Sequence, residues 1–337
     1  MRLLFELSKE HSTIPIDEIC CCCEAESISF EILEKNENIF LIKTSADIAK
    51  IKQIAQRLSY SFYVDELLFS CKNYIKDLKE SMQKYQIYED GSLAIFYKNR
   101  SNKKNSKEII TVIAEFYTKG RVVDLHSADI KIRAFITDDS IYVGRELYQI
   151  DRSLFEKRKV QFRPFFSPIS LHPKLARSLV NLSRVPFDGR LLDPFCGTGG
   201  ILLEAGLLGI QVIGSDIDQK MIQGCQSTLD HYAIKNYTLI CSDIGDINKH
   251  VDKPVDAVVT DLPYARSTTT KGEDIKTLYL RTFTGISSLL KKNGFAVIGV
   301  SDNKSVSIDP DCFNLINIYE YRVHRSMTRY FFVLKKV

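Results

Sequence analysis

Four consecutive residues, Asp261-Leu262-Pro263-Tyr264, follow an apolar run over 255–260 that predicts a buried strand. Their types suit the binding of an amino group on a flat ring. The Asp261 carboxylate and the Pro263 carbonyl could each accept one N–H, which would orient the nitrogen lone pair and stabilise positive charge developing on the nitrogen. The Tyr264 ring could stack on the flat ring. The structural alternative is a tight turn with a packed tyrosine.

A glycine-rich turn, residues 191–200, lies between a short apolar strand and an expected helix over 201–208. Glycines are needed where a backbone approaches a ligand closely or takes a positive φ. Gly197 and Gly199 match the first two glycines of the dinucleotide fingerprint G-x-G-x-x-G, but Leu202 stands at the third position. No Gly-Lys-Ser/Thr sequence of a P-loop follows. The turn therefore matches neither phosphate-binding motif.

Acidic residues end further expected strands. Asp216 follows Asp193 by about 20 residues, the spacing at which an acid meets a ribose diol in nucleotide-binding βαβ units. Asp243 ends the next expected strand. Each acid alone could cap a helix, as we expect for Asp218. Acids at the ends of successive strands instead indicate the ligand-binding edge of an open α/β sheet.

These features resemble the motifs of S-adenosylmethionine (SAM) dependent methyltransferases that modify exocyclic amino groups of nucleobases. The resemblance implies that Asp193 faces the ammonium group of SAM, that Asp216 binds its ribose and that Asp243 accepts from its adenine. The residues expected to bind the cofactor are Asp193, Pro194, Phe195, Cys196, Gly197, Gly199, Asp216, Ile217, Asp243 and Ile244. The implied catalytic residues are Asp261, Pro263 and Tyr264, and no metal is implied.

The composition of the chain limits the class of protein and its expected location. The 337 residues are 45% hydrophobic and carry a net charge of +4, which is typical of a globular protein and permits nucleic-acid binding without requiring it. The chain has no apolar run of membrane-spanning length, so no membrane segment is expected. Cysteines without a pairing pattern and no export signal favour a cytoplasmic location. Zinc sites usually separate their paired cysteines by about two to four residues, whereas Cys20–Cys23 are consecutive. We therefore interpret this run as small buried residues of a helix over 15–24.

The N-terminal half predicts two domains of mixed α/β structure. Residues 1–48 resemble a ferredoxin-like domain, with expected strands at 3–7, 27–34 and 39–44, the helix at 15–24 and an amphipathic helix from residue 48. In residues 49–150, Arg121–Asp129 resembles the core of the RNA-binding THUMP domain, although Ala128 stands where that family usually has proline. A helix is expected at 74–82 and strands at 93–97, 109–117 and 140–144.

A basic, proline-containing stretch over residues 151–171 is interpreted as a linker between domains. Its basic residues could guide a nucleic-acid backbone or could simply be solvated. The candidates for contact with the substrate are Lys157, Arg158, Lys159 and Arg163. His172-Pro173 then opens a helix with proline at its first position. This segment resembles methyltransferase motif X, in which we expect His172 to orient or cap rather than to act as a base.

Residues 172–337 predict a SAM methyltransferase domain of Rossmann-like type. The order of strands and terminal acids resembles the topology of that fold, a mixed seven-stranded sheet with helices on both faces. After the reactive loop, a helix over 275–292 is expected to end at Asn293-Gly294. A strand over 295–300 and a closing pair over 314–322 and 329–334 complete the expected sheet.

Over its whole length the chain resembles the archaeal THUMP-domain tRNA (guanine-10-N2) methyltransferases. The resemblance implies methyl transfer from SAM to the exocyclic N2 of guanosine 10 in tRNA, with Arg266 as a further substrate contact. Ala265 departs from the glycine that is more common in the family. Whether one or two methyl groups are added, and whether a small activating partner subunit is needed, is left open.

Other functions remain compatible with parts of this pattern. The enzyme could methylate another tRNA guanine or ribosomal RNA, as related THUMP enzymes do. It could methylate adenine N6 in DNA, since those enzymes share the Asp/Asn-Pro-Pro-Tyr theme, but the THUMP-like region argues against DNA. It could also be a non-catalytic tRNA-binding factor, which the intact Asp261, Pro263 and Tyr264 argue against.

Overall fold

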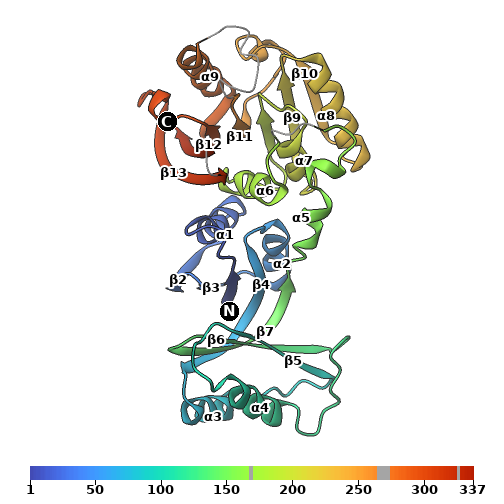
Figure 1. Ribbon diagram of the computed structural model, residues 1–337, viewed down its shortest axis with the longest axis vertical. Helices are drawn as coiled ribbons and strands as arrows, with labels where there is room; N and C mark the ends of the chain where they lie inside the picture. Colours follow the sequence, from blue (N-terminus) through green and yellow to red (C-terminus); the bar gives the residue numbers. More distant parts are fainter. Residues whose placement is uncertain (167–169, 264–273, 325–326) are drawn as a thin grey trace. The chain divides into compact units, whose positions relative to one another are not determined.

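The computed structural model describes residues 1–166, 170–263, 274–324 and 327–337. The chain forms two compact units, each with one seven-stranded sheet (Figure 1). The first unit contains residues 1–9, 29–56 and 61–150, and the second contains residues 10–28, 57–60 and 151–337. Each unit is therefore a mixed α/β fold built from segments that are discontinuous in sequence.

The sheet of the first unit has the order β2-β3-β1-β4-β7-β6-β5. Its strands are β1 (Arg2–Leu7), β2 (Phe30–Lys35), β3 (Ile39–Thr44), β4 (Ser61–Lys72), β5 (Leu93–Asn99), β6 (Ile130–Ile136) and β7 (Ser140–Gln149). Its helices are α2 (Ile48–Arg57), α3 (Ile75–Lys84) and α4 (Ser106–Tyr117). Helices α3 and α4 lie side by side against the part of the sheet formed by β4 and β5 (Figure 1).

Two expectations for this unit need correction. The sheet runs across the predicted boundary at residues 48/49, because β4 pairs antiparallel with β1 on one side and with β7 on the other. Residues 109–117, expected as a strand, belong to helix α4. Ile109, Ile113 and Tyr117 are its buried residues, and a spacing of four places them on one helical face.

The sheet of the second unit has the order β10-β9-β8-β11-β12-β14-β13. Its strands are β8 (Arg190–Asp193), β9 (Gln211–Asp216), β10 (Tyr237–Cys241), β11 (Val255–Asp261), β12 (Leu290–Val300), β13 (Phe313–His324) and β14 (Met327–Lys336). The first five strands in this order are parallel, and β14 is antiparallel to both of its neighbours. The expected mixed sheet and closing hairpin are confirmed.

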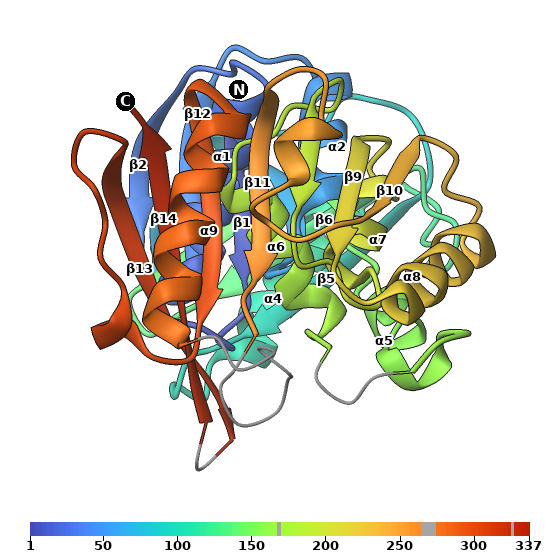
Figure 2. The same ribbon diagram turned by 90° about the horizontal axis from the view of Figure 1, so that it is seen from above.

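Helices cover both faces of this sheet (Figure 2). The helices of this unit are α1 (Ile14–Ala25), α5 (Ser153–Lys157), α6 (Pro173–Leu182), α7 (Gly200–Gly206), α8 (Gln219–His231) and α9 (Ile275–Leu289), with short 3₁₀ turns at Val160–Phe162, Ile247–Lys249 and Asn303–Ser305. Because strand side chains alternate, Leu191 packs with α6, α7 and α8, while Leu192 packs with α9 on the other face. Helix α9 ends earlier than predicted, because β12 begins at Leu290.

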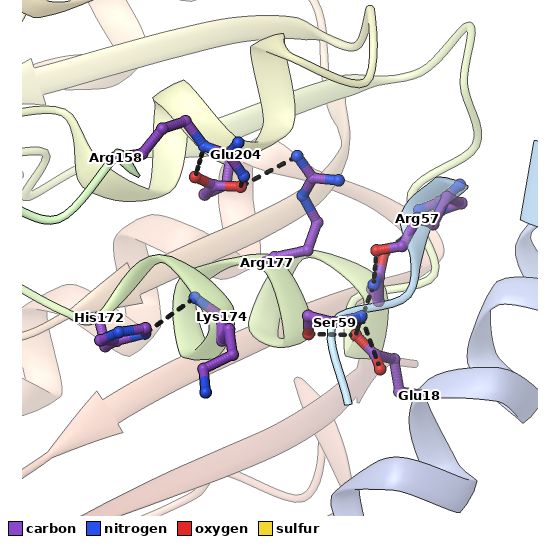
Figure 3. Close-up of polar contacts among 9 residues, drawn as sticks. Glu18, Arg57, Ser59, Arg158, His172, Lys174, Arg177 and Glu204 are labelled. Carbon is purple, nitrogen blue, oxygen red and sulfur yellow. Dashed lines mark hydrogen bonds and ion pairs between the residues drawn. The ribbon is translucent and has the colours of Figure 1, made fainter. Parts of the chain in front are cut away.

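Helix α1 belongs to the second unit although it comes from the N-terminal segment. Glu18 of α1 is fully buried and accepts hydrogen bonds from the Ser59 backbone N–H and Oγ (Figure 3). It also accepts from the Tyr60 N–H and from the Asn181 side chain of α6. Arg57 is also fully buried, and its Nε donates to Asn181 Oδ1 at 3.2 Å. These polar contacts join α1 and residues 57–60 to α6.

The cysteine run forms part of α1, as expected. Cys21, Cys22 and Cys23 are buried, and burial raises the pKa of the Cys21 and Cys23 thiols to about 12, so both remain protonated. The described residues hold no cluster of three or more His, Cys, Asp or Glu side chains arranged to hold a metal ion. Within the same residues, no helix has the length and apolar character needed to cross a bilayer.

Candidate cofactor-binding and catalytic site

Four carboxylates lie along one edge of the second unit's sheet. Asp193, Asp216 and Asp261 are the last residues of β8, β9 and β11, and Asp243 follows β10 by two residues. These strands are parallel neighbours in the order β10-β9-β8-β11, so their carboxyl ends meet at the same edge. That edge is where open α/β sheets bind their ligands.

The glycine-rich turn after β8 is shaped by two left-handed residues. Gly197 has φ +49° and Gly199 has φ +78°, a region that favours glycine. The Gly197 N–H donates to Asp216 Oδ2 at 3.0 Å, which ties the turn to the end of β9. A Cβ at Gly199 would lie 2.6 Å from Cys225 Sγ of α8. At Gly199 the backbone therefore lies closer to α8 than a residue with a side chain would allow.

Asp193 is a buried carboxyl at the centre of this edge. It is 1% exposed and accepts hydrogen bonds from Thr260 Oγ1 at 2.7 Å and from the Phe195 N–H at 3.2 Å. Burial raises the pKa of Asp193 to about 7, and the charges of Asp261 and Asp216 act in the same direction. A cation placed beside Asp193 would favour its ionised form and would lower its pKa.

Asp216 and Asp218 have separate roles after β9. Asp216 accepts from the Asp218 N–H at 2.9 Å through Oδ1, in addition to its contact with Gly197. Asp218 caps α8 by accepting from the Lys220 N–H at 2.8 Å, as predicted. Asp216 is only partly buried, so its carboxylate keeps a solvent-facing side on which a hydroxyl could bind.

Asp243 has a partner that the sequence did not reveal. Arg281 of α9 reaches it with Nη1 2.8 Å from Oδ1 and Nη2 3.3 Å from Oδ2. The Gly245 N–H also donates to Asp243 Oδ1. The Arg281 guanidinium holds the pKa of Asp243 below its usual range. No local pattern links Arg281 to Asp243, because the two belong to different elements.

Asp261 ends β11 beside an equally unpredicted arginine. Arg329 of β14 is 5% exposed, and its Nη2 lies 3.4 Å from Asp261 Oδ2. The next residue, Leu262, donates its N–H to the Gly299 carbonyl of β12 at 2.9 Å, and Pro263 is partly buried. The expected contributions of Tyr264 and Arg266 lie outside the described residues.

The remaining predicted cofactor residues lie within the turn or after strands β9 and β10. Pro194, Cys196 and Ile244 are buried, and Phe195 is partly buried against the α9 side of the core. Ile217 is 45% exposed directly after Asp216 and offers apolar surface at the edge. His172 caps α6, since its Nδ1 accepts from the Lys174 N–H at 3.2 Å, and this confirms the expected capping role (Figure 3).

Two of the four basic linker residues are not available to a nucleic-acid backbone. Arg158 is held by Glu204 of α7 through contacts of 2.8 and 3.0 Å, and Arg177 of α6 contacts the same carboxylate at 2.9 Å (Figure 3). Arg163 is 5% exposed and donates from Nε to the Arg158 carbonyl. The expectation of phosphate contacts for these two residues is corrected, because phosphate binding requires an accessible side chain.

The other two linker residues face solvent. Lys157 is exposed at the end of α5. Lys159 pairs with Glu156, one helical turn before it, and keeps about a third of its side chain exposed. Both side chains are therefore accessible in a way that Arg158 and Arg163 are not.

Comparison with known proteins gives both sequence and fold relatives. Residues 161–330 match the RMKL-like methyltransferase domain family, UPF0020. The chain is 33% identical to the tRNA (guanine(10)-N2)-dimethyltransferase of Methanothermobacter thermautotrophicus with both chains covered completely, and 31% identical to that of Methanocaldococcus jannaschii over 99% of both. Its fold resembles TrmN from Thermus thermophilus, with a TM-score of 0.57 and 18% identity over 100% of both chains.

Proposed function

Because the chain belongs to the tRNA (guanine(10)-N2)-dimethyltransferase family, and its residues 161–330 to the RMKL-like methyltransferase domain family, we propose that it transfers methyl groups from SAM to N2 of guanosine 10 in tRNA. The observation that carries this proposal is the alignment of Asp193, Asp216, Asp243 and Asp261 along one sheet edge, with Pro263 two residues after the last. Three of these acids suit the cofactor, and Asp261 suits the substrate amine.

The residues at this edge fit SAM by their chemistry. A buried carboxyl such as Asp193 suits the ammonium group, and the partly exposed Asp216 suits a ribose diol. Asp243, oriented by Arg281, suits the adenine amino group, and the exposed Ile217 suits its ring. The turn with Gly197 and Gly199 would leave room for the methionine part. When bound, SAM supplies an electrophilic methyl group on its sulfonium.

The chain's own groups would orient the substrate nitrogen. The Asp261 carboxylate and the Pro263 carbonyl would each accept an N–H of guanine N2, directing its lone pair toward the methyl group. The carboxylate would also stabilise the positive charge that develops on nitrogen. Guanosine 10 must leave its stack to reach these groups, at a cost of a few kcal/mol, and Tyr264 would stack on it.

A second methyl transfer would need the remaining N–H to be held in the same way. The two full-length relatives are named as dimethyltransferases, which supports a dimethylated product here. After the first transfer, N2 keeps one N–H, and rotation about the C2–N2 bond would let either Asp261 or Pro263 accept from it while the lone pair faces the methyl group of SAM. Each transfer would form an N2–methyl bond as the sulfonium C–S bond breaks, which releases S-adenosylhomocysteine, and the N2 proton would pass to the Asp261 carboxylate or to solvent. N2,N2-dimethylguanosine would therefore require a second molecule of SAM.

The first unit would bind the tRNA away from the target base. We propose that it combines the ferredoxin-like and THUMP regions expected over residues 1–150, and that it holds the acceptor end. Val122 and Leu125 of the THUMP-like stretch are 72% and 61% exposed, and Arg121 donates to the carbonyls of Ile87 and Glu89, which supports an ordered surface there. Lys157 of the linker would contact the tRNA backbone. A cytoplasmic location would match such a substrate.

Two transcripts that differ by one amino group test this proposal. A tRNA with guanosine at position 10 should accept labelled methyl groups from SAM, whereas the same tRNA with inosine at position 10 should accept none, because inosine lacks the N2 amine. Equal labelling of both would place the methyl group elsewhere. Double-stranded DNA and a ribosomal RNA fragment in parallel reactions test the alternative substrates.

A further inference from the structure

We propose that Arg329 is a positioning residue for Asp261: its guanidinium holds the carboxylate in one ionised orientation for the substrate amine, an inference that rests on the proposed function. Arg329 comes from β14, two strands away from β11. Its Nη2 nevertheless lies 3.4 Å from Asp261 Oδ2, and both side chains are largely buried, at 6% and 13% exposed. Solvent therefore screens this pair less than a surface pair.

Strand β12, which lies between β11 and β14, has a glycine where a side chain would separate Asp261 from β14. Gly299 of β12 is paired in register with Asp261 on one side and with Phe331 of β14 on the other. A Cβ at Gly299 would lie 2.6 Å from Asp261 Oδ1 and 2.8 Å from Phe331 Cε1. Arg329 precedes Phe331 by two residues, so the two share a face of β14. The absent side chain at Gly299 is what gives the Asp261 carboxylate its space next to the arginine.

Asp261 has acidic neighbours, so a nearby cation helps to keep its carboxylate ionised. Asp193 of β8 and Asp216 of β9 are acidic neighbours along the edge, and the charge of Asp261 contributes to the raised pKa of Asp193. Burial raises the pKa of Tyr279 of α9, and the charges of Asp302 and Asp261 add to this shift. Arg329 supplies positive charge from β14. Loss of Arg329 would remove a cation that favours the ionised form of Asp261, while the acidic neighbours Asp193 and Asp216 would remain.

Protonation or rotation of Asp261 would remove its function. A protonated carboxyl offers an O–H where the substrate amine needs an acceptor, and a carboxylate free to rotate would hold the amine less often in line. Misplacement of a reacting group by about 1 Å can cost roughly 100-fold in rate. Arg329 would thus act through Asp261 and would contact neither the base nor SAM.

Variants at Arg329 test this role by rate, pH dependence and cofactor binding together. We expect Arg329→Met to lower kcat by roughly 10- to 100-fold, with the Kd for SAM within about twofold of the wild type. The acid limb of its kcat profile should move to higher pH, because Asp261 loses its cation. Arg329→Lys should restore the position of the limb and part of the rate. Arg322→Met, on the exposed surface of β13, is the matched control.

A purely structural role would give a different result. It would lower kcat and SAM binding together with the melting temperature, and it would leave the acid limb where it is; that outcome overturns the proposal. If Arg329→Met does not fold, Gly299→Ala crowds the same carboxylate from β12 without removing a charge. We expect Gly299→Ala to lower kcat while the Kd for SAM stays within about twofold, and a fully active Gly299→Ala enzyme would contradict the geometry.

A titration without substrate separates this inference from the proposed function. In protein labelled with ¹³C at the aspartate carboxyls, the Asp261 signal is assigned by its loss in Asp261→Asn. It should titrate at higher pH in Arg329→Met than in the wild type, whichever nucleic acid is methylated. An unchanged titration would overturn the inference about Arg329 alone, whereas failure to methylate tRNA would overturn the proposed function alone.

Discussion

Arg281 forms a bidentate ion pair with Asp243, with Nη1 2.8 Å from Oδ1 and Nη2 3.3 Å from Oδ2. The arginine extends from α9 to a loop that follows β10, so it fixes the carboxylate proposed to accept from the adenine amino group. Each side chain is about one-third exposed. Solvent therefore limits the pair to about 1 kcal/mol.

Removing that contact should weaken cofactor binding modestly. We expect Arg281→Gln to raise the Kd for SAM by roughly three- to fivefold in calorimetry, since 1.4 kcal/mol corresponds to a factor of ten. Lys249→Gln breaks the nearby but exposed pair with Asp246 and should leave the Kd unchanged. Equal effects of the two substitutions would show that general charge, rather than the orientation of Asp243, controls affinity.

SAM binding should depend on pH through Asp193. Its pKa of about 7 in the free protein means that the carboxyl is mostly protonated at pH 6, whereas the ammonium of SAM favours the ionised form. Binding at pH 6 should therefore release a proton, and affinity should be roughly fivefold weaker at pH 6 than at pH 7, where the ammonium of SAM is still mostly protonated. Calorimetry in buffers of different ionisation enthalpy measures both quantities. A wild-type affinity that is flat over this range would contradict the proposed role of Asp193, and Asp193→Asn should abolish the pH dependence.

Glu18 should stabilise the second unit although it is far from the cofactor edge in sequence. Its replacement by alanine would leave the N–H groups of Ser59 and Tyr60 and the Asn181 amide without their buried acceptor, at a cost of about 3 kcal/mol in the free energy of unfolding. Glu24→Ala removes the pair of a half-exposed acid with Arg184 and should cost less than about 1 kcal/mol. Urea unfolding compares the two variants, and similar midpoints would refute the role of Glu18.

Substitution of Asp261 should abolish methyl transfer but leave cofactor binding nearly unchanged. We expect Asp261→Ala to reduce methyl transfer below detection while the Kd for SAM changes less than about threefold, because the carboxylate is proposed to hold the substrate amine. Filter binding of labelled SAM and transfer to tRNA are measured on the same preparation. If SAM binding is lost in parallel with activity, Asp261 belongs to the cofactor site instead.

The strand-end acids could be predicted because each follows its own strand directly, so local sequence order fixes the sheet edge. Arg281 and Arg329 could not, because each meets its acid only after strands and helices distant in sequence have packed. Each pairing depends on the folded chain. For the same reason, Arg163 and Arg158 gave no sign in the sequence that they would be buried or held by Glu204.

The errors in the first unit have similar physical causes. β4 was not predicted, because Asp65 interrupts its apolar pattern; Asp65 is buried beside Arg133 of β6, whose Nε lies 3.2 Å away. The apolar, β-branched residues 109–113 favoured a strand, but their burial pattern is helical. Helix α1 was predicted correctly, yet its placement in the second unit depends on the partners of Glu18, which only the folded chain brings together.

We propose that this chain methylates N2 of guanosine 10 in tRNA. The most direct measurement incubates the purified protein with SAM and an unmodified tRNA transcript, digests the product and locates the modified nucleoside by mass spectrometry. N2-methylguanosine followed by N2,N2-dimethylguanosine, both at position 10, is the expected result. Methylation at another position or on another atom, or no transfer by protein that binds SAM, would contradict the account.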